Sequence, residues 1–259
     1  MYLSNFHTHS SFCDGKEEPK VYVEEAIKRG FKALGFSGHA PLPFTNNFSI
    51  NREDLQAYCT SVKTLKEAYR DKLEIYLSLE ADYIPGISWP FEMFHKDCKL
   101  DYIIGSVHLV KGDRDDRFWF IDGPKYEIYD EGLRELFSGD IKKGVTAYYH
   151  QINEMIEAEK PDIVGHLDKI KMHNKERWFS EDDKWYQSLW HESLELIKEK
   201  QCLLEVNTRG LYKGRSDSLF PGESLLKECL IKKIPLVLNS DAHKPEELEG
   251  FYAEAMKQL

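Results

Sequence analysis

The sequence predicts an α/β protein of one domain, residues 1–259, in which about seven parallel strands close into an irregular barrel. Short apolar runs alternate with helical patterns along the chain, which is typical of a parallel sheet covered by helices. Histidines and carboxylates stand at the C-terminal ends of many separate runs. An open doubly wound sheet fits the number of units as well, but only a closed barrel brings all of those ends around one point.

Strands are expected where apolar or β-branched residues form short runs. These runs are Tyr2–His7, Ala33–Ser37, Glu74–Leu79, Tyr102–His108, Ile163–Leu167, Leu203–Val206 and Leu236–Asn239. Helical patterns are found at Glu18–Arg29, Arg52–Tyr69, Thr146–Ala158, Lys184–Glu199, Gly222–Lys232 and Glu246–Lys257. Asn51 is expected to cap the second helix by accepting a backbone N–H bond. Gly30 is expected to end the first helix, because a positive φ costs glycine no Cβ clash.

Three longer connections are predicted to form the walls of a site. Ala40–Ile50 is aromatic and stiffened by prolines, Val110–Pro124 mixes charge with aromatic rings, and Arg209–Pro221 carries three cations. Long loops at the working end of a barrel usually shape the access of substrate. The chain has no G-x-G-x-x-G or Walker A sequence, no internal repeat and no low-complexity linker, which favours a single domain.

Composition restricts the class of partner and the compartment. The formal net charge of −10 argues against nucleic acid, because phosphate backbones require a basic surface. The five cysteines are scattered and form no C-x-x-C pair, which indicates reduced thiols in a cytosolic protein. No secretory signal precedes the first strand, and no apolar stretch approaches the roughly 20 residues that span a bilayer. A cytoplasmic protein with no membrane segment is therefore expected, and its oligomeric state is not indicated.

The strongest chemical signal is a pair of histidines, His7 and His9, at the end of the first strand. Side chains at positions i and i+2 of a strand project from the same side, so one cation can bind both imidazoles. Further strands end in the same residue types, at His39, Glu80, Asp82, His108, His166, Asp168, Asp241 and His243. Imidazole and carboxylate ligands suit zinc and harder divalent cations, whereas a soft-metal site would need thiolates. The pattern predicts a multinuclear metal site.

Glu80 is expected to bridge two cations, one oxygen to each, as two-metal hydrolases require. Asp82 alternates with it along the strand and is expected to orient a ligand imidazole. Competing nucleophiles have weaker support. The segment Gly35-Phe-Ser-Gly38 lacks the spacing of a serine nucleophile elbow, and Cys202 does not stand in a cysteine-phosphatase loop. Water activated by metal ions is the nucleophile that the residues favour.

Seven segments, in this order along nearly the whole chain, resemble the polymerase and histidinol phosphatase (PHP) superfamily. The resemblance is closest to its monofunctional histidinol-phosphatase branch. The segments are His7-Thr-His9-Ser-Ser-Phe-Cys-Asp14-Gly, Gly38-His39-Ala-Pro, Glu80-Ala-Asp-Tyr-Ile-Pro-Gly, Gly105-Ser-Val-His108, Gly165-His166-Leu-Asp-Lys, Glu205-Val-Asn-Thr and Asn239-Ser-Asp241-Ala-His243. Any one of these matches would be weak, but seven in order are a strong signal.

The resemblance implies a distorted seven-stranded (β/α)7 TIM-like barrel that holds two to three divalent ions, zinc, manganese or iron. It implies three ligand sets: His7, His9, Glu80 and Asp241 for the first ion; Glu80, His108 and His166 for the second; Asp14, His39 and His243 for the third. Many superfamily members carry histidine where this chain has Asp14. That departure matches the histidinol-phosphatase branch. It gives the third site a harder ligand, a carboxylate oxygen in place of an imidazole nitrogen.

The reaction implied by the resemblance is hydrolysis of L-histidinol phosphate to L-histidinol and phosphate in histidine biosynthesis, by a metal-activated hydroxide. Glu80 would hold the metal ions, and Asp14, His243 or a metal-bound water would protonate the leaving group. The expected substrate contacts are Arg209, Lys213 and Arg215 on the phosphate, and an aromatic ring, Phe44 or Trp119, on the imidazole.

Three alternative functions stay open at this point. The nearest is a broader-specificity PHP phosphatase acting on sugar phosphates or nucleotides, since a shared metal centre does not set the leaving group. A phosphodiesterase is disfavoured by net acidity and by the lack of a basic groove. A metal-binding domain without turnover would predict eroded ligands, yet every expected position is filled.

Overall fold

The structure is a computed structural model that describes residues 3–112 and 117–259. Seven parallel strands form one sheet in the order β1-β2-β3-β4-β7-β8-β9. They are β1 (Ser4–Asn5), β2 (Ala33–Phe36), β3 (Glu74–Asp82), β4 (Tyr102–Ser106), β7 (Ile163–Val164), β8 (Leu203–Asn207) and β9 (Leu236–Asn239). Each predicted strand is therefore present. Tyr2 of the first run, and residues 113–116 of the Val110–Pro124 connection, lie outside the described residues.

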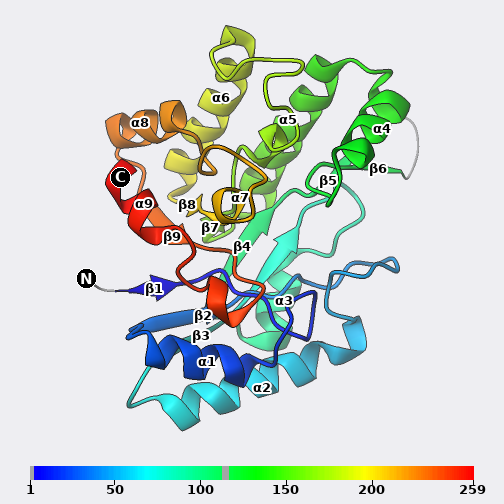
Figure 1. Cartoon of the computed structure of the whole chain (residues 1–259). Coiled ribbons are helices and arrows are strands. Elements are labelled where there is room, and N and C mark those ends of the chain that lie inside the picture. Colours follow the sequence, from blue (N-terminus) through cyan, green and yellow to red (C-terminus); the bar gives the residue numbers. More distant parts are fainter. Residues whose placement is uncertain (1–2, 113–116) are drawn as a thin grey trace.

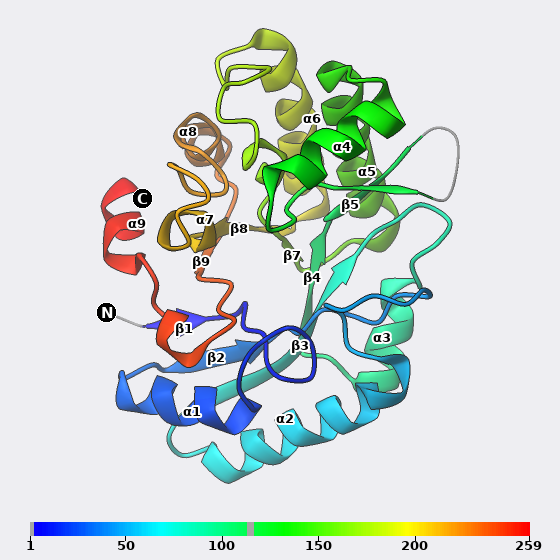
Figure 2. The ribbon, with the colours of Figure 1, turned by 45° about the vertical axis from the view of Figure 1, so that its right-hand side comes forward.

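The sheet closes on itself where the first and last strands meet. A parallel bridge joins Thr8 to Ala242, and the backbone N–H of His9 donates to the carbonyl of Ala242 at 2.8 Å. The N–H of Ala242 in turn donates to the carbonyl of His7 at 3.1 Å. These bonds complete a nearly closed ring of seven strands (Figure 2). The predicted barrel is thus confirmed over the open doubly wound sheet.

Helices cover the outside of the ring. They are α1 (Pro19–Lys28), α2 (Leu55–Tyr69), α3 (Phe91–Cys98), α4 (Tyr126–Phe137), α5 (Ile141–Glu159), α6 (Lys184–Lys200), α7 (Arg209–Tyr212), α8 (Glu223–Lys232) and α9 (Tyr252–Gln258). Short 3₁₀ turns lie at Arg52–Asp54, Lys169–Lys171 and Pro245–Glu247. In Figure 1, α1 and α2 lie on one side of the strands, and α5 and α6 on the opposite side. Among the described residues, no helix is long and apolar enough to cross a membrane.

Five of the six predicted helices are confirmed with small shifts at their ends, but the last is broken. The 3₁₀ turn Pro245–Glu247 is separated from α9 by Phe251, whose φ of 59° interrupts the helix. Sequence reasoning missed α3 and α4, although α4 buries Tyr129, Leu133 and Phe137 at a spacing of four residues. That spacing is the signal which would have revealed α4.

One of the two predicted helix caps is confirmed. Gly30 has a φ of 81°, and its N–H donates to the carbonyl of Ile27 at 3.0 Å. Asn51 occupies the N-cap position of the 3₁₀ turn before α2, but the side-chain bond predicted for it is absent. Its side chain makes no capping bond to a backbone N–H but donates to the carboxylate of Asp54 at 3.0 Å. Asn51 stands before a 3₁₀ turn, and the neighbouring carboxylate takes its amide group instead.

The connection after β4 contains a hairpin of β5 (Leu109–Lys111) and β6 (Phe118–Phe120). Trp119 anchors this hairpin to α4 and is completely buried. Its ring centroid lies 4.5 Å from that of Tyr129, and its Nε1–H donates to the Tyr129 carbonyl at 2.8 Å. A Cβ built on Gly144 of α5 would lie 2.7 Å from the indole, so the two helices close tightly around it.

Replacing this ring should destabilise the whole protein. We expect Trp119→Ala to lower the free energy of unfolding by about 3–5 kcal/mol, because it removes a large side chain from a packed core. Urea unfolding followed by circular dichroism measures this change. Trp178→Ala is the control, because that ring is 36% exposed, and less than half the loss is expected there. Equal losses in the two variants would contradict the anchoring role of Trp119.

Candidate metal centre

The ligand-type residues predicted from the sequence converge at the C-terminal ends of the strands. Each follows or ends a strand: His7 and His9 after β1, His39 after β2, Glu80 in β3, His108 after β4, His166 after β7, and Asp241 and His243 after β9. Asp14 lies in the loop between β1 and α1. All of these side chains except Asp14 are buried.

Several strands end where the ligand residues begin, because the backbone there bonds to side chains. The N–H of His108 donates to Asp82 at 2.9 Å, and the N–H of His166 donates to Glu205 at 2.9 Å. This explains why β4 and β7 are shorter than the predicted runs. The carboxylates take the backbone N–H groups that a longer strand would have used.

Glu80 occupies the middle of the cluster and is 1% exposed. Its Oε2 lies 3.1 Å from Nε2 of His7, 3.5 Å from Nε2 of His9 and 3.2 Å from Nδ1 of His39. Asp241 faces the same space, with Oδ1 3.3 Å from Nε2 of His9. One oxygen of Glu80 therefore points toward imidazoles from the first two strands.

The other oxygen of Glu80 points toward a second pair of imidazoles. Its Oε1 lies 2.9 Å from Nε2 of His166 and 3.4 Å from Nε2 of His108. The hydroxyl of Ser106 donates to the same oxygen at 2.7 Å. A carboxylate whose two oxygens face different sets of imidazoles has the geometry that bridging two cations requires.

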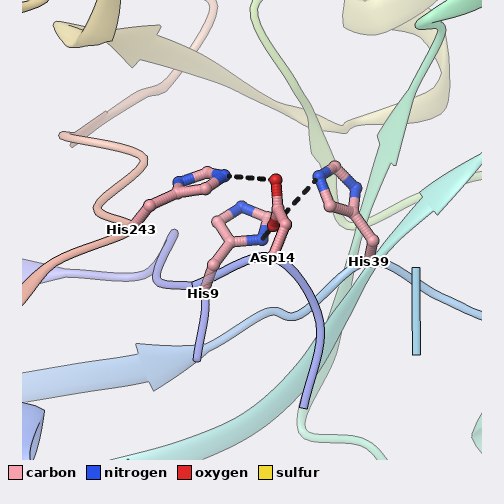
Figure 3. Close-up of side chains that lie close together, drawn as sticks. All are labelled: His9, Asp14, His39 and His243. Atoms are coloured by element: carbon pink, nitrogen blue, oxygen red, sulfur yellow. Dashed lines mark hydrogen bonds and ion pairs between the residues drawn. The ribbon is translucent and has the colours of Figure 1, made fainter. Parts of the chain in front are cut away.

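A third group lies at the mouth of the barrel and contains Asp14 (Figure 3). Oδ2 of Asp14 lies 3.1 Å from Nε2 of His243, and its Oδ1 lies 3.6 Å from Nδ1 of His9. Nε2 of His39 is 3.9 Å from the same Oδ1. The side chain of Asp14 is 31% exposed and that of His243 is 11% exposed, so this group faces the solvent side of the cluster.

Within the described residues, three sets bring potential ligand atoms within 4.8 Å of one another. They are His9, Asp14, His39 and His243; His7, His9 and Asp241; and His39, Glu80 and His108. The first two sets closely follow the groups that the family resemblance implies, with His9 added to the Asp14 group. The third set has His39 where the resemblance places His166.

The chemistry of these atoms fits divalent cations. Several are buried and lack a hydrogen-bond partner within the described structure: Nε2 of His7 and His9, Nδ1 of His39, and Oδ1 of Asp14 and Asp241. Buried polar atoms are normally satisfied, so nitrogen and oxygen atoms that converge on common points without other partners fit the coordination of a cation. None of the three ligand sets contains a thiol.

Two carboxylates behind the ligands hold imidazoles in place. Asp82 accepts from Nδ1 of His108 at 2.8 Å, as predicted, and Glu205 accepts from Nδ1 of His7 at 2.6 Å. Glu205 is itself held by the side-chain amide of Asn239 at 3.0 Å. Such partners fix the tautomer, so that Nε2 is free to bind a metal ion. Sequence reasoning gave Glu205 no role, although a carboxylate inside the otherwise apolar run Leu203–Val206 was a usable signal.

The protonation of the cluster follows from its charges. Burial opposes the charged form of His108, but Asp82, Asp122 and Glu80 outweigh it and raise its pKa to about 9. Burial also disfavours the charged form of Glu80, yet the imidazoles, His7 first, hold its pKa well below the usual range. Glu80 thus stays ionised at neutral pH and attracts positive charge. Bound metal ions would take the place of the extra proton that a charged imidazole such as His108 carries.

A cavity of ≈ 180 Å³ opens above the cluster. Its wall carries Lys169 and Asp122, joined by an ion pair of 2.9 Å, and both were missed by sequence reasoning. The ammonium group of Lys169 also lies 3.8 Å from Oδ2 of Asp241. Lys169 is nearly buried, so its charge acts on the cavity in a setting of low dielectric.

The structure brings two of the five expected substrate contacts to this cavity, Arg209 and Arg215. Lys213 instead pairs with Glu247 at 3.0 Å. Phe44 stacks on Phe118 with ring centroids 5.4 Å apart and lines a different cavity.

The expectation for Trp119 is corrected by its burial, since a ring with no exposed surface cannot stack on a substrate. The aromatic rings that do line the cavity above the metal centre are Phe48 and Phe120. They come from the same two connections as Phe44 and Trp119. The two predicted connections therefore reach the cavity, but through rings other than the predicted ones.

A barrel of this kind with a cluster of imidazoles and carboxylates at its mouth defines a class of metal-binding protein. The chain belongs to the PHP domain family, whose model matches residues 5–209. It is 32% identical to the histidinol-phosphatase of Bacillus subtilis over 98% of each chain. It is 26% identical to the histidinol-phosphatase of Lactococcus lactis, over 94% of this chain and 85% of that protein.

Two solved structures share this fold. HisK from Listeria monocytogenes superposes with a TM-score of 0.83 at 25% identity, covering 96% of this chain and 99% of that one. Histidinol phosphate phosphatase from Lactococcus lactis, complexed with zinc, L-histidinol and phosphate, gives a TM-score of 0.69 at 22% identity. That superposition covers 99% of this chain and 92% of the Lactococcus chain.

Removing a central ligand should abolish metal binding without unfolding the barrel. We expect His9→Ala and Glu80→Ala to bind at least one zinc ion fewer per chain and to lose activity, while far-UV circular dichroism is retained. Elemental analysis after loading with zinc measures the stoichiometry. His150→Ala, which removes an exposed histidine, is the control and should bind as the wild type does. Full zinc content in both ligand variants would remove the basis for this metal centre.

Proposed function

We propose that this protein is a histidinol-phosphatase that hydrolyses L-histidinol phosphate to L-histidinol and phosphate. The observation that carries the proposal is the position of Glu80, whose two oxygens face separate groups of imidazoles beneath a cavity with cationic walls. The similarity to the Bacillus subtilis enzyme over the whole chain supports the same substrate. The zinc, histidinol and phosphate bound to the Lactococcus lactis protein support it further.

We assign two to three divalent ions, zinc, manganese or iron, to the ligand sets around Glu80 and Asp14. Such ions lower the pKa of bound water and neutralise charge on the phosphoryl oxygens. Side chains behind the ligands hold the ligand atoms in position. Glu205 and Asp82 orient the imidazoles of His7 and His108, and both carboxylates are buried.

Lys169 and Arg209 are the proposed phosphate contacts. Both line the cavity, and both are held from behind by acids, Lys169 by Asp122 and Arg209 by Glu247 at 3.6 Å. A guanidinium and an ammonium group fixed in this way can receive a dianion with little reorganisation. Arg215 lines the same cavity and keeps its expected role as a phosphate contact.

Asp14 and His243 are the proposed source of the proton for the leaving oxygen. In the two-ion form, with no ion at the Asp14 group, Nε2 of His243 can hold this proton against Oδ2 of Asp14, 3.1 Å away at the exposed side of the cluster. Their position at the cavity wall places them between the metal ligands and the incoming substrate. Of the donors that the sequence left open, this pair is the one that the chain itself supplies.

Phe48 and Phe120 are the proposed contacts of the substrate imidazole. Their rings stack at a centroid distance of 6.2 Å and an angle of 18°, on the same side of the cavity. Aromatic faces favour a flat heterocycle.

We also propose a cytoplasmic location. We further propose that the substrate is a small molecule rather than nucleic acid, since the net charge of the chain is −10.

A substrate panel tests this function. We expect purified, zinc-loaded protein to release phosphate from L-histidinol phosphate with a kcat/KM at least 100-fold above that for p-nitrophenyl phosphate or 5′-nucleotides. The physical reason is that the cavity provides specific contacts for the leaving group as well as for phosphate. Phosphate release is measured by a coupled assay for each substrate. Similar rates across the panel would demote the protein to a broad-specificity phosphatase.

The aromatic wall makes a separate prediction. Phe120→Ala should lower kcat/KM for L-histidinol phosphate by about 10-fold, because base or heterocycle stacking on an aromatic ring is worth about 1–3 kcal/mol. It should change kcat/KM for p-nitrophenyl phosphate much less. Phe118→Ala is the matched control, since this neighbouring ring of β6 does not line the cavity. An equal loss on both substrates would contradict the assignment of Phe120.

A further inference from the structure

The metal ligand Asp241 has an unusual backbone conformation. Its φ is 55°, in the left-handed region, which aspartate adopts more readily than most residues with a Cβ but which still costs free energy relative to an ordinary φ. This turn comes directly after β9 and places Oδ1 of Asp241 3.3 Å from Nε2 of His9 and 3.9 Å from Nε2 of His7. An ordinary φ would point the carboxylate elsewhere. The first ligand set therefore depends on whatever keeps this peptide in place.

The carbonyl groups on either side of this turn accept hydrogen bonds from α7. The hydroxyl of Tyr212 lies 2.9 Å from the carbonyl oxygen of Ser240 and 3.1 Å from that of Asp241. Nη1 of Arg209 donates to the same Asp241 oxygen at 2.7 Å. A shared hydroxyl proton and a guanidinium thus fix two successive carbonyl groups, which sets the direction of the peptide between them.

The ring of Tyr212 is itself confined. A Cβ built on Gly250 would lie 2.6 Å from Cδ1 of the ring, so the backbone at Gly250 packs directly against it. The hydroxyl of Thr208, the residue before α7, donates to the carbonyl of Gly250 at 2.6 Å. These contacts hold α7 above the end of β9. Arg209 also lines the cavity, so it has a second role. The two carbonyl groups that the Tyr212 hydroxyl contacts both belong to the turn at Asp241.

We infer that Tyr212 is a positioning residue that holds Asp241 in its left-handed conformation and so directs its carboxylate into the first metal site. Tyr212 belongs to none of the ligand sets and does not line the cavity. The inference rests on the proposed metal centre and adds a determinant of its affinity. According to this inference, the affinity of the first site for its ion depends on the Tyr212 hydroxyl, which lies outside the ligand sets.

The chain offers a matched control in Tyr252. The hydroxyl of this second tyrosine also lies close to two carbonyl oxygens, those of Ser4 at 3.1 Å and Leu238 at 3.2 Å. It contacts the first and last strands of the barrel, and the carbonyl groups that it contacts belong to neither Ser240 nor Asp241. Tyr252→Phe therefore removes an equivalent pair of backbone contacts without touching the turn at Asp241.

The experiment compares zinc binding by the full-length wild type, Tyr212→Phe and Tyr252→Phe, using competition with a chromophoric chelator. We expect Tyr212→Phe to weaken the binding of one zinc ion about tenfold, the lower end of what changes behind metal ligands cost. Tyr252→Phe should bind zinc as the wild type does. In an Asp241→Asn background, Tyr212→Phe should cause no further loss, because it acts through that side chain.

Thermal unfolding of the metal-free proteins separates positioning from general stability. Both phenylalanine variants should unfold at similar temperatures, and only Tyr212→Phe should gain less stability from added zinc. Wild-type affinity in Tyr212→Phe, an equal loss in Tyr252→Phe, or an additional loss in the Asp241→Asn background would overturn the inference. A wild type that binds fewer than two zinc ions would instead contradict the proposed metal centre.

Discussion

The structure depends on the burial of one carboxylate, Glu80, at the centre of the barrel mouth. A buried charge is costly unless opposite charge and hydrogen bonds surround it. Imidazoles from four other strand ends supply that environment, and Ser106 donates to one of its oxygens. Because these imidazoles come from distant parts of the sequence, the carboxylate can be accommodated only when strands β1, β2, β3, β4 and β7 have assembled. Metal binding and completion of the fold are therefore linked.

Closure is achieved between the first and last strands, and it has a direct chemical consequence. The bridge from Thr8 to Ala242 places two i, i+2 pairs side by side, His7 with His9 and Asp241 with His243. The ring centroids of His9 and His243 are 4.0 Å apart. The residue between the members of each pair provides the backbone contact, while the flanking side chains face the cluster. The same backbone bonds that seal the sheet thus assemble half of the site.

The walls of the cavity offset the acidity of the chain. Lys169 and Arg209 provide positive charge at the cluster, although the protein as a whole carries a net charge of −10. Each is bound to an acid, Asp122 or Glu247, that limits its motion. The hairpin that carries Phe120 is anchored by the buried Trp119. The recognition surface is consequently attached to the core rather than carried on a free loop.

The sequence by itself determined the order of the seven barrel strands, five of the helices and the residue types at the strand ends. Periodicity and local ligand spacing are properties of short segments, so the pair His7 and His9 could be recognised without a structure. Only the tertiary structure decided that Glu205 and Lys169 join the site, that Lys213 turns to Glu247, and that Trp119 packs inside. Those outcomes depend on which distant segments meet in space, and no local pattern encodes that.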